Sequence, residues 1–252
     1  MHGGGVTTLS GCRPPMMGSM SAMRHLALLL CLCVSFVAAG DAAVAAVPEW
    51  KYEKAVAAYE AKDAASPPAD GGVACIGSST FTRWQTVAAD LAPLPVYNRA
   101  FGGSRTSDVL RAAPRLIIPR KPKVVVYYCG DNDLADATKG DPDVPVQGFA
   151  DFVATVRAAL PQVRIVYVSI KPSPKRAASW AKVQEANAKV KTMCEADKRL
   201  AYVDIAPAIL DAEGKPRPEL FVEDRLHLNA DGYRSITALI KPVVEQAWKA
   251  AD

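Results

Sequence analysis

Four short polar clusters in the sequence combine residue types that could carry out acyl transfer. They read Gly77-Ser78-Ser79, Gly102-Gly103, Gly130-Asp131-Asn132-Asp133 and Asp224-Arg225-Leu226-His227. A serine hydroxyl becomes a strong nucleophile when a histidine accepts its proton, and a carboxylate holds that histidine in the required tautomer. Backbone N–H groups of a glycine loop and an asparagine amide can stabilise the oxyanion that forms. The clusters supply all of these groups, in Ser79, Gly103, Asn132, Asp224 and His227.

Taken singly, each cluster has an ordinary structural explanation. Gly-Ser-Ser and Gly-Gly are common in turns, and Gly-Asp-Asn-Asp can be a turn or a helix cap. The occurrence of these clusters after successive strand-like segments is what favours a shared site. The sequence has no Cys-x-x-Cys pair and no His/Cys cluster, so neither a metal ion nor another cofactor is expected.

The apolar segments before the clusters predict the strands that must position them. Five short, often β-branched runs lie at 73–76, 95–101, 123–129, 164–170 and 201–205. Between these runs, apolar residues recur at helical spacing, as in Phe149, Phe152 and Val156. Strands that alternate with helices predict an α/β fold whose parallel sheet is covered on both faces. Functional groups of such sheets lie beyond the carboxyl ends of the strands, so the clusters should converge there.

In this order the four clusters resemble the sequence blocks of the SGNH hydrolases, also called the GDSL esterase/lipase superfamily. That family carries Gly-Asp-Ser, a glycine, Gly-x-Asn-Asp and Asp-x-x-His. The resemblance implies a flavodoxin-like, three-layer α/β/α sandwich with a five-stranded parallel sheet. It also implies Ser79 as nucleophile, His227 as base and Asp224 as the group that orients the base. The implied oxyanion hole consists of the N–H groups of Ser79 and Gly103 and the side chain of Asn132.

The first block departs from the family pattern. Ser78 stands where the family has aspartate, and Thr80 stands where the family has leucine. That aspartate is not a triad member, so its loss need not abolish the chemistry, but it leaves two adjacent serines. Aligning Gly77 assigns the nucleophile to Ser79, with Ser78 as the alternative. The sequence lacks a Gly-x-Ser-x-Gly elbow, which argues against the α/β-hydrolase fold.

The N-terminal segment has the composition of an export signal. Residues 1–39 contain two arginines and no acidic residue, and 26–39 form an apolar run. A positive segment, a short apolar core and small residues at its end predict a signal peptide over 1–39, with an uncleaved anchor as the alternative. We therefore expect an exported protein, periplasmic or secreted, without a stable membrane span after processing. A helix and linker over 40–72 and a hydrolase domain over 73–252 would follow.

Removal of residues 1–39 would leave one histidine and three cysteines. Because His2 and His25 lie in the removed segment, His227 would be the single candidate base. Cys75 and Cys129 lie in apolar strand-like runs, which favours buried free thiols. With Cys194 the number is odd, so pairing between some of the three is the alternative.

These features predict a serine esterase acting on small acyl esters. The formal net charge of +4 is not gathered into a basic block, so nucleic-acid binding is not supported. The sequence has no long amphipathic lid, which favours short acyl esters or acetylated carbohydrate over insoluble fat; lysolipid is a further candidate. Lys171 or Arg105 could meet an anionic substrate group, or either could be a solvated loop charge. The alternatives are an acyltransferase and a non-catalytic module that binds a glycan or lipid headgroup.

Overall fold

A five-stranded, all-parallel β-sheet forms the centre of the structure, a computed structural model that describes residues 49–251. The spatial order of its strands is β2-β1-β3-β4-β5. Their bounds are β1 (Val73–Gly77), β2 (Val96–Asn98), β3 (Val124–Tyr128), β4 (Arg164–Val168) and β5 (Leu200–Val203). The predicted flavodoxin-like sheet is therefore confirmed, and all five strands lie within the segments predicted for them, to within one residue at their ends.

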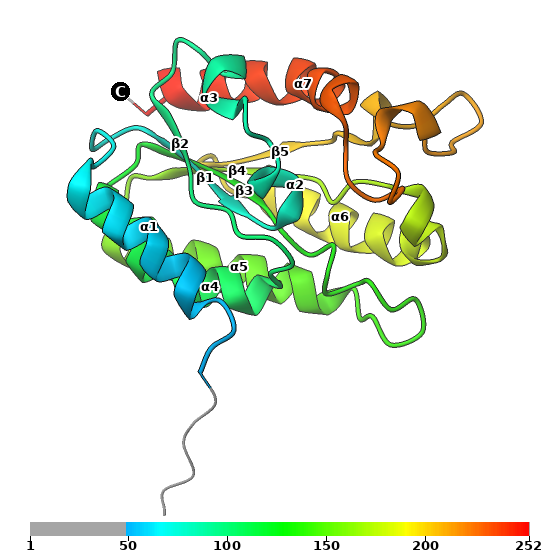
Figure 1. The fold of residues 1–252 in the computed structure, drawn as a ribbon, viewed down its shortest axis with the longest axis horizontal. Helices are drawn as coiled ribbons and strands as arrows, with labels where there is room; N and C mark the ends of the chain where they lie inside the picture. Colours follow the sequence, from blue (N-terminus) through cyan, green and yellow to red (C-terminus); the bar gives the residue numbers. More distant parts are fainter. Residues whose placement is uncertain (1–48, 252) are drawn as a thin grey trace, which may run out of the picture. The chain divides into compact units, whose positions relative to one another are not determined.

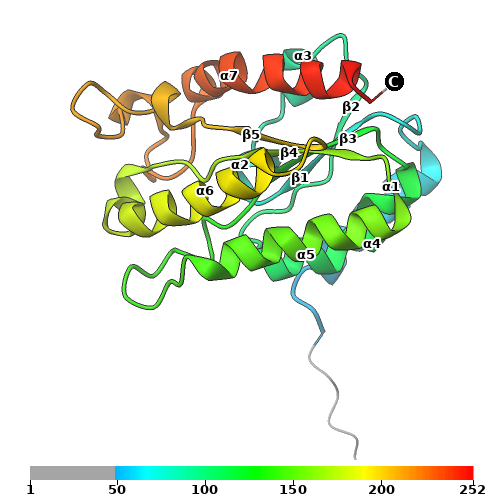
Figure 2. The same ribbon diagram turned by 180° about the vertical axis from the view of Figure 1, so that it is seen from behind.

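Helices cover both faces of this sheet and complete three layers (Figures 1 and 2). One face carries α1 (Glu53–Ala65), α4 (Thr106–Leu116), α5 (Asp143–Ala159) and α6 (Trp180–Glu195). The other face carries α3 (Val87–Asp90) and α7 (Ala230–Lys249), and the single-turn helix α2 (Ser79–Thr82) follows β1. The connections within 49–251 also contain the 3₁₀ helices η1 (Ile118–Arg120), η2 (Pro174–Ser179), η3 (Ala206–Ala208) and η4 (Pro218–Leu220).

The strand β3 shows why the sequence forms this sandwich. All five of its residues are buried, and their side chains alternate between the two helical layers. Val125 and Tyr127 pack with α4 and α5, whereas Val126 and Tyr128 pack with α7. A strand buried on both faces must be apolar at every position, which explains the continuous apolar run in the sequence.

The helices α5 and α7 form where apolar residues recur at helical spacing. Phe149, Phe152 and Val156 are fully buried along one side of α5. At the start of α7 the side chain of Asn229 accepts the N–H of Gly232 at 3.0 Å, which caps the first turn. The last predicted cluster therefore lies immediately before a well-defined helix start.

The strand β2 ends earlier than the sequence predicts. It is regular only to Asn98, although the N–H groups of Arg99 and Phe101 still donate to the carbonyls of Cys75 and Gly77. The side chain of Asn98 accepts the N–H of Ala100 at 2.9 Å, and this local bond competes with the regular ladder. The chain thus follows β1 to residue 101 with an irregular backbone.

The predicted signal peptide over 1–39 and the beginning of the predicted segment 40–72 lie outside the described residues. The remainder of that segment contains the expected helix α1. Tyr59 of α1 donates its hydroxyl to the carbonyl of Ala100 at 2.7 Å, and Trp50 donates to Asp108 of α4 at 2.9 Å. Of the helices in 49–251, none has the length and apolar character needed to cross a membrane.

The three cysteines of the described chain are buried and unpaired, as predicted for Cys75 and Cys129. Burial raises the pKa of the Cys75 thiol to about 12. Burial also raises the pKa of Cys194 to about 12. At neutral pH these groups are therefore protonated and serve as apolar packing.

Candidate active site

The hydroxyl of Ser79 lies just beyond the carboxyl end of β1, at the start of α2. Gly77 makes this placement possible, because its φ is +149° and a Cβ there would lie 1.8 Å from the carbonyl oxygen of Tyr128. The N–H of Ser78 donates to the same carbonyl at 3.0 Å. Only glycine allows β1 to turn away this close to β3, so the glycine of the first block fixes where Ser79 leaves the sheet.

A tight turn before α7 presents the imidazole of His227. The Asp224 carboxylate holds this turn, since its Oδ1 accepts the N–H groups of Leu226 and His227, each at 2.9 Å. Arg225 within the turn has a φ of +58°, which residues other than glycine rarely adopt. Burial alone would raise the pKa of Asp224, but the hydrogen bonds from His227 and Leu226 outweigh it and hold that pKa well below its usual range. Asp224 is therefore ionised at neutral pH.

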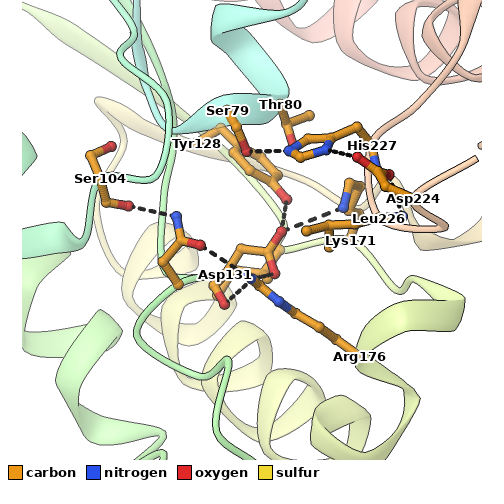
Figure 3. A network of polar contacts seen from close by, with 12 residues as sticks. Ser79, Thr80, Ser104, Tyr128, Asp131, Lys171, Arg176, Asp224, Leu226 and His227 are labelled. Atoms are coloured by element: carbon orange, nitrogen blue, oxygen red, sulfur yellow. Dashed lines mark hydrogen bonds and ion pairs between the residues drawn. The ribbon is translucent and has the colours of Figure 1, made fainter. Parts of the chain in front are cut away.

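The imidazole of His227 joins Ser79 to Asp224 (Figure 3). Its Nδ1 lies 2.6 Å from Asp224 Oδ2, and its Nε2 lies 2.9 Å from Ser79 Oγ. Because an ionised carboxylate only accepts hydrogen bonds, Nδ1 carries the ring proton and Nε2 accepts from the Ser79 hydroxyl. The Ser78 hydroxyl, by contrast, is buried and without a hydrogen-bond partner in the described part of the chain. The geometry favours Ser79 over Ser78 as the group that His227 can activate.

Hydrogen-bond donors surround the small open cavity into which Ser79 faces. No hydrogen bond within residues 49–251 uses the backbone N–H of Ser79 or of Gly103, so both remain available. The side chain of Asn132 uses one of its N–H groups on the carbonyl of Ser104, at 2.9 Å, and has a second one left. The cavity measures about 280 Å³ and is lined by Ser79, Thr82, Arg83, Gly102, Gly103, Asn132, Leu226 and His227.

Hydrogen bonds between the loops after β1, β2 and β3 fix these donors relative to one another. The Ser104 hydroxyl donates to the carbonyl of Gly77 at 3.2 Å, and the Ser104 carbonyl accepts from Asn132. Asp133 accepts the hydroxyl of Thr106 at 2.9 Å, and also the N–H of that residue at the start of α4. The three clusters thus form one connected unit, as their common position at the sheet edge predicted.

A buried group of charges adjoins the loop after β3. The Asp131 carboxylate contacts the guanidinium of Arg176, lies 3.4 Å from Lys171 Nζ and accepts the Tyr128 hydroxyl at 3.2 Å (Figure 3). Burial alone would raise the pKa of Asp131, but the positive charges of Lys171 and Arg176 outweigh it and hold that pKa below its usual range. Burial lowers the pKa of Lys171. None of these four side chains lines the cavity, although Arg176 also donates a hydrogen bond to Asn132, which does.

Of the two alternatives for Lys171 and Arg105, a substrate contact or a solvated loop charge, the structure supports the second for Arg105 and neither for Lys171. Lys171 is 3% exposed and faces Asp131, because β3 and β4 are neighbours and their loops meet. Arg105 is exposed at the start of α4 and does not line the cavity. Sequence reasoning also missed Arg176, although an acidic residue after β3 and basic residues after the adjacent β4 could have indicated an ion pair.

A three-layer α/β/α sandwich that gathers serine, glycine, asparagine and histidine at the carboxyl edge of its sheet defines the SGNH class of hydrolases. A sequence model of the GDSL-like lipase/acylhydrolase family matches residues 69–235, and the chain belongs to this family. The predicted family resemblance is thus confirmed. No curated protein matches the chain. Within residues 49–251, no group of three or more His, Cys, Asp or Glu side chains is arranged to hold a metal ion.

Solved structures with this fold come from several organisms. A GDSL-like lipase from Bacteroides thetaiotaomicron has 22% sequence identity and a TM-score of 0.66, over 76% of this chain and 98% of that one. A lipase/acylhydrolase from Enterococcus faecalis has 19% identity and a TM-score of 0.55, over 69% and 95% of the two chains. A carbohydrate esterase family 3 protein from Talaromyces cellulolyticus has 17% identity and a TM-score of 0.56, over 71% and 98%. At these identities the likeness concerns the fold.

Proposed function

We propose that the protein is a serine esterase that hydrolyses esters of short acyl chains, with Ser79 as its nucleophile. The observation that carries this proposal is the continuous hydrogen-bonded chain from Ser79 Oγ through His227 to Asp224, at 2.9 and 2.6 Å. The Ser79 end of this chain faces a cavity lined by residues with unused N–H donors, Ser79, Gly103 and Asn132. Membership of an acylhydrolase family supports ester hydrolysis as the type of reaction.

The proposed reaction proceeds in two halves through an acyl-serine. Ser79 Oγ attacks the ester carbonyl carbon while Nε2 of His227 accepts the hydroxyl proton, and the N–H groups of Ser79, Gly103 and Asn132 stabilise the oxyanion. His227 then gives its proton to the leaving oxygen, and the alcohol departs. Water then attacks the acyl-serine while His227 accepts its proton. His227 returns that proton to Ser79 Oγ as the acyl–oxygen bond breaks, which releases the acid and restores the free hydroxyl. Asp224 stabilises the imidazolium in both halves.

The shape of the cavity supports a short acyl group and an exposed alcohol. At about 280 Å³ it lies at the low end of the range for small-molecule sites, and Thr82 and Leu226 stand on its wall. Because it is open, the alcohol part of the ester can extend into solvent. Acetylated carbohydrate suits both properties, and a carbohydrate esterase is among the proteins with this fold.

Labelling with a fluorophosphonate tests the proposal directly. Such a reagent forms a covalent adduct only with an activated serine, and peptide mass spectrometry locates it. We expect one adduct, on Ser79, together with hydrolysis of p-nitrophenyl acetate. A non-catalytic binding module would remain unlabelled, and an acyltransferase would form an acylated product when a sugar acceptor is supplied. Either result would overturn the proposal.

The acyl chain length should control the rate. Between p-nitrophenyl acetate and p-nitrophenyl octanoate we expect kcat/KM to fall by about tenfold or more, because Leu226 is the one large aliphatic side chain that the cavity wall offers to a longer acyl chain. Steady-state rates across the series, measured below the critical micelle concentration, provide the check. A rate that rises with chain length would contradict a short-acyl specificity while leaving the nucleophile assignment intact.

Replacing Asn132 by alanine should lower kcat with little change in KM. The substitution removes one of the proposed oxyanion donors, and the expected loss is about 10²–10³-fold. Steady-state kinetics with p-nitrophenyl acetate measure it. Asp136 in the same loop is exposed and makes only local hydrogen bonds, so Asp136→Ala is the matched control and should retain the wild-type rate. Equal rates in the Asn132 variant and the wild type would exclude Asn132 from the oxyanion hole.

A further inference from the structure

The side-chain amide of Asn132 is held at both ends by other residues. Its Oδ1 accepts a hydrogen bond from Nη2 of Arg176 at 2.9 Å, and its Nδ2 donates to the carbonyl of Ser104 at 2.9 Å. An asparagine amide has one carbonyl oxygen and two N–H groups. With the oxygen and one N–H engaged, a single N–H remains for the cavity that Asn132 lines.

The contacts with Arg176 and with the Ser104 carbonyl determine which way this amide faces. A guanidinium has only donors, so it can meet the oxygen of Asn132 but not its NH₂ group. Turning the amide over would place the NH₂ group against Arg176 and the amide oxygen against the carbonyl oxygen of Ser104. Both hydrogen bonds would then be lost, because each donor would face a donor and each acceptor an acceptor. Arg176 and the Ser104 carbonyl together therefore select the orientation in which Asn132 can donate to an oxyanion.

The guanidinium of Arg176 is itself fixed by buried groups. Nη1 contacts both the carboxylate and the backbone carbonyl of Asp131, the residue before Asn132. Asp131 is 6% exposed and is held in turn by Lys171 Nζ at 3.4 Å and the Tyr128 hydroxyl at 3.2 Å (Figure 3). Arg176 thus contacts two consecutive residues with two different nitrogen atoms of its guanidinium. The single ammonium nitrogen of a lysine could not do this.

The segment that carries Arg176 also contacts the turn that carries the base. The N–H of Lys175 donates to the carbonyl of Arg225 at 3.0 Å, within the turn between Asp224 and His227. One short segment after β4 therefore touches both the loop with the proposed oxyanion donor and the loop with the proposed base. This position suits a residue that sets the geometry of the site without facing the substrate.

We propose that Arg176 is a positioning residue of the oxyanion hole, which orients the Asn132 amide so that its free N–H faces the reacting carbonyl. The inference rests on the proposed esterase function. Arg176 does not line the cavity, so it acts through Asn132 and not on the substrate. Its positive charge next to the amide oxygen also polarises the amide, which strengthens the remaining N–H as a donor.

A double-mutant cycle between Arg176 and Asn132 tests this coupling. With p-nitrophenyl acetate, R176Q should lower kcat by about 10–100-fold, a part of the full loss of one oxyanion donor, and leave KM within about threefold. In the N132A background, R176Q should change kcat by less than about threefold, because the group it positions is already absent. R176K keeps the positive charge but has one nitrogen atom in place of the guanidinium, so its kcat should lie between those of R176Q and the wild type. K175A removes the neighbouring exposed charge and should stay within about twofold of the wild type.

Nuclear magnetic resonance of the side-chain amides provides a readout that does not depend on activity. The Asn132 NH₂ signals, assigned from their loss in N132A, should shift in R176Q and remain in place in K175A. If R176Q does not fold, R176K is taken through the same cycle and the same spectra. An unchanged rate in a folded R176Q, or an equal loss of rate in the presence and absence of Asn132, would overturn the proposal. Equal activity of wild type and S79A would instead refute the esterase function.

Discussion

Replacing Ser79 by alanine is expected to reduce kcat for ester hydrolysis by about 10⁴–10⁶-fold, the usual effect of removing a catalytic serine. The variant keeps the backbone N–H of residue 79 and the other oxyanion donors, so it should still bind substrate with a similar KM. Ser79 is a half-buried residue at the start of a single-turn helix, and loss of its hydroxyl should hardly change the free energy of unfolding. Steady-state kinetics with p-nitrophenyl acetate and a thermal denaturation curve measure both quantities.

The adjacent serine provides the matched control for this experiment. Ser78 carries the same hydroxyl one residue earlier, but that hydroxyl is buried and does not contact His227. Ser78→Ala should therefore keep the activity within about tenfold of the wild type, with losses due to packing rather than chemistry. Full activity in S79A together with inactivity in S78A would transfer the nucleophile to Ser78 and overturn the proposed site.

Most of the fold could be predicted because its causes are local in the sequence. A strand that is apolar at every position, such as 124–128, must be covered on both faces, which favours a parallel sheet between two layers of helices. The clusters after the strands could be placed together because parallel strands share a carboxyl edge. Gly77 is an example at the level of one residue. A Cβ at this position would collide with the carbonyl of Tyr128, so β1 ends at a glycine and the polar residues that follow it lie at the edge of the sheet.

The role of the charged residues behind the site could not be predicted in the same way. The sequence shows that Lys171 follows a strand, but not whether its side chain faces the cavity or the neighbouring loop. That choice depends on Asp131, which lies 40 positions earlier and meets Lys171 only because β3 and β4 are adjacent. The sequence leaves Lys171 as either a substrate contact or a solvated loop charge, whereas in the structure it is buried against the Asp131 carboxylate. Arg176 was missed for the same reason.

Replacing His227 by alanine should reduce kcat by about 10⁴–10⁶-fold, as large an effect as the loss of Ser79. The two other histidines in the sequence, His2 and His25, belong to the predicted signal peptide, so no other imidazole is expected to replace the lost base. Because the serine and the histidine act as one unit in the proposed mechanism, the double variant of Ser79 and His227 should be no slower than either single variant. Kinetics of the three proteins with p-nitrophenyl acetate provide the measurement.

A substitution at Asp224 separates the proposed base from the group proposed to orient it. In Asp224→Asn one side-chain oxygen still accepts the N–H groups of Leu226 and His227, so the turn should persist. The new amide N–H would face His227 Nδ1 and favour the tautomer with the proton on Nε2, which cannot accept from Ser79. We expect a loss of about 10³–10⁴-fold in kcat, and the double variant with alanine at position 227 should be no slower than the single His227 variant. Wild-type activity in the His227 variant would exclude the proposed mechanism, because the described chain has no second histidine to supply the base.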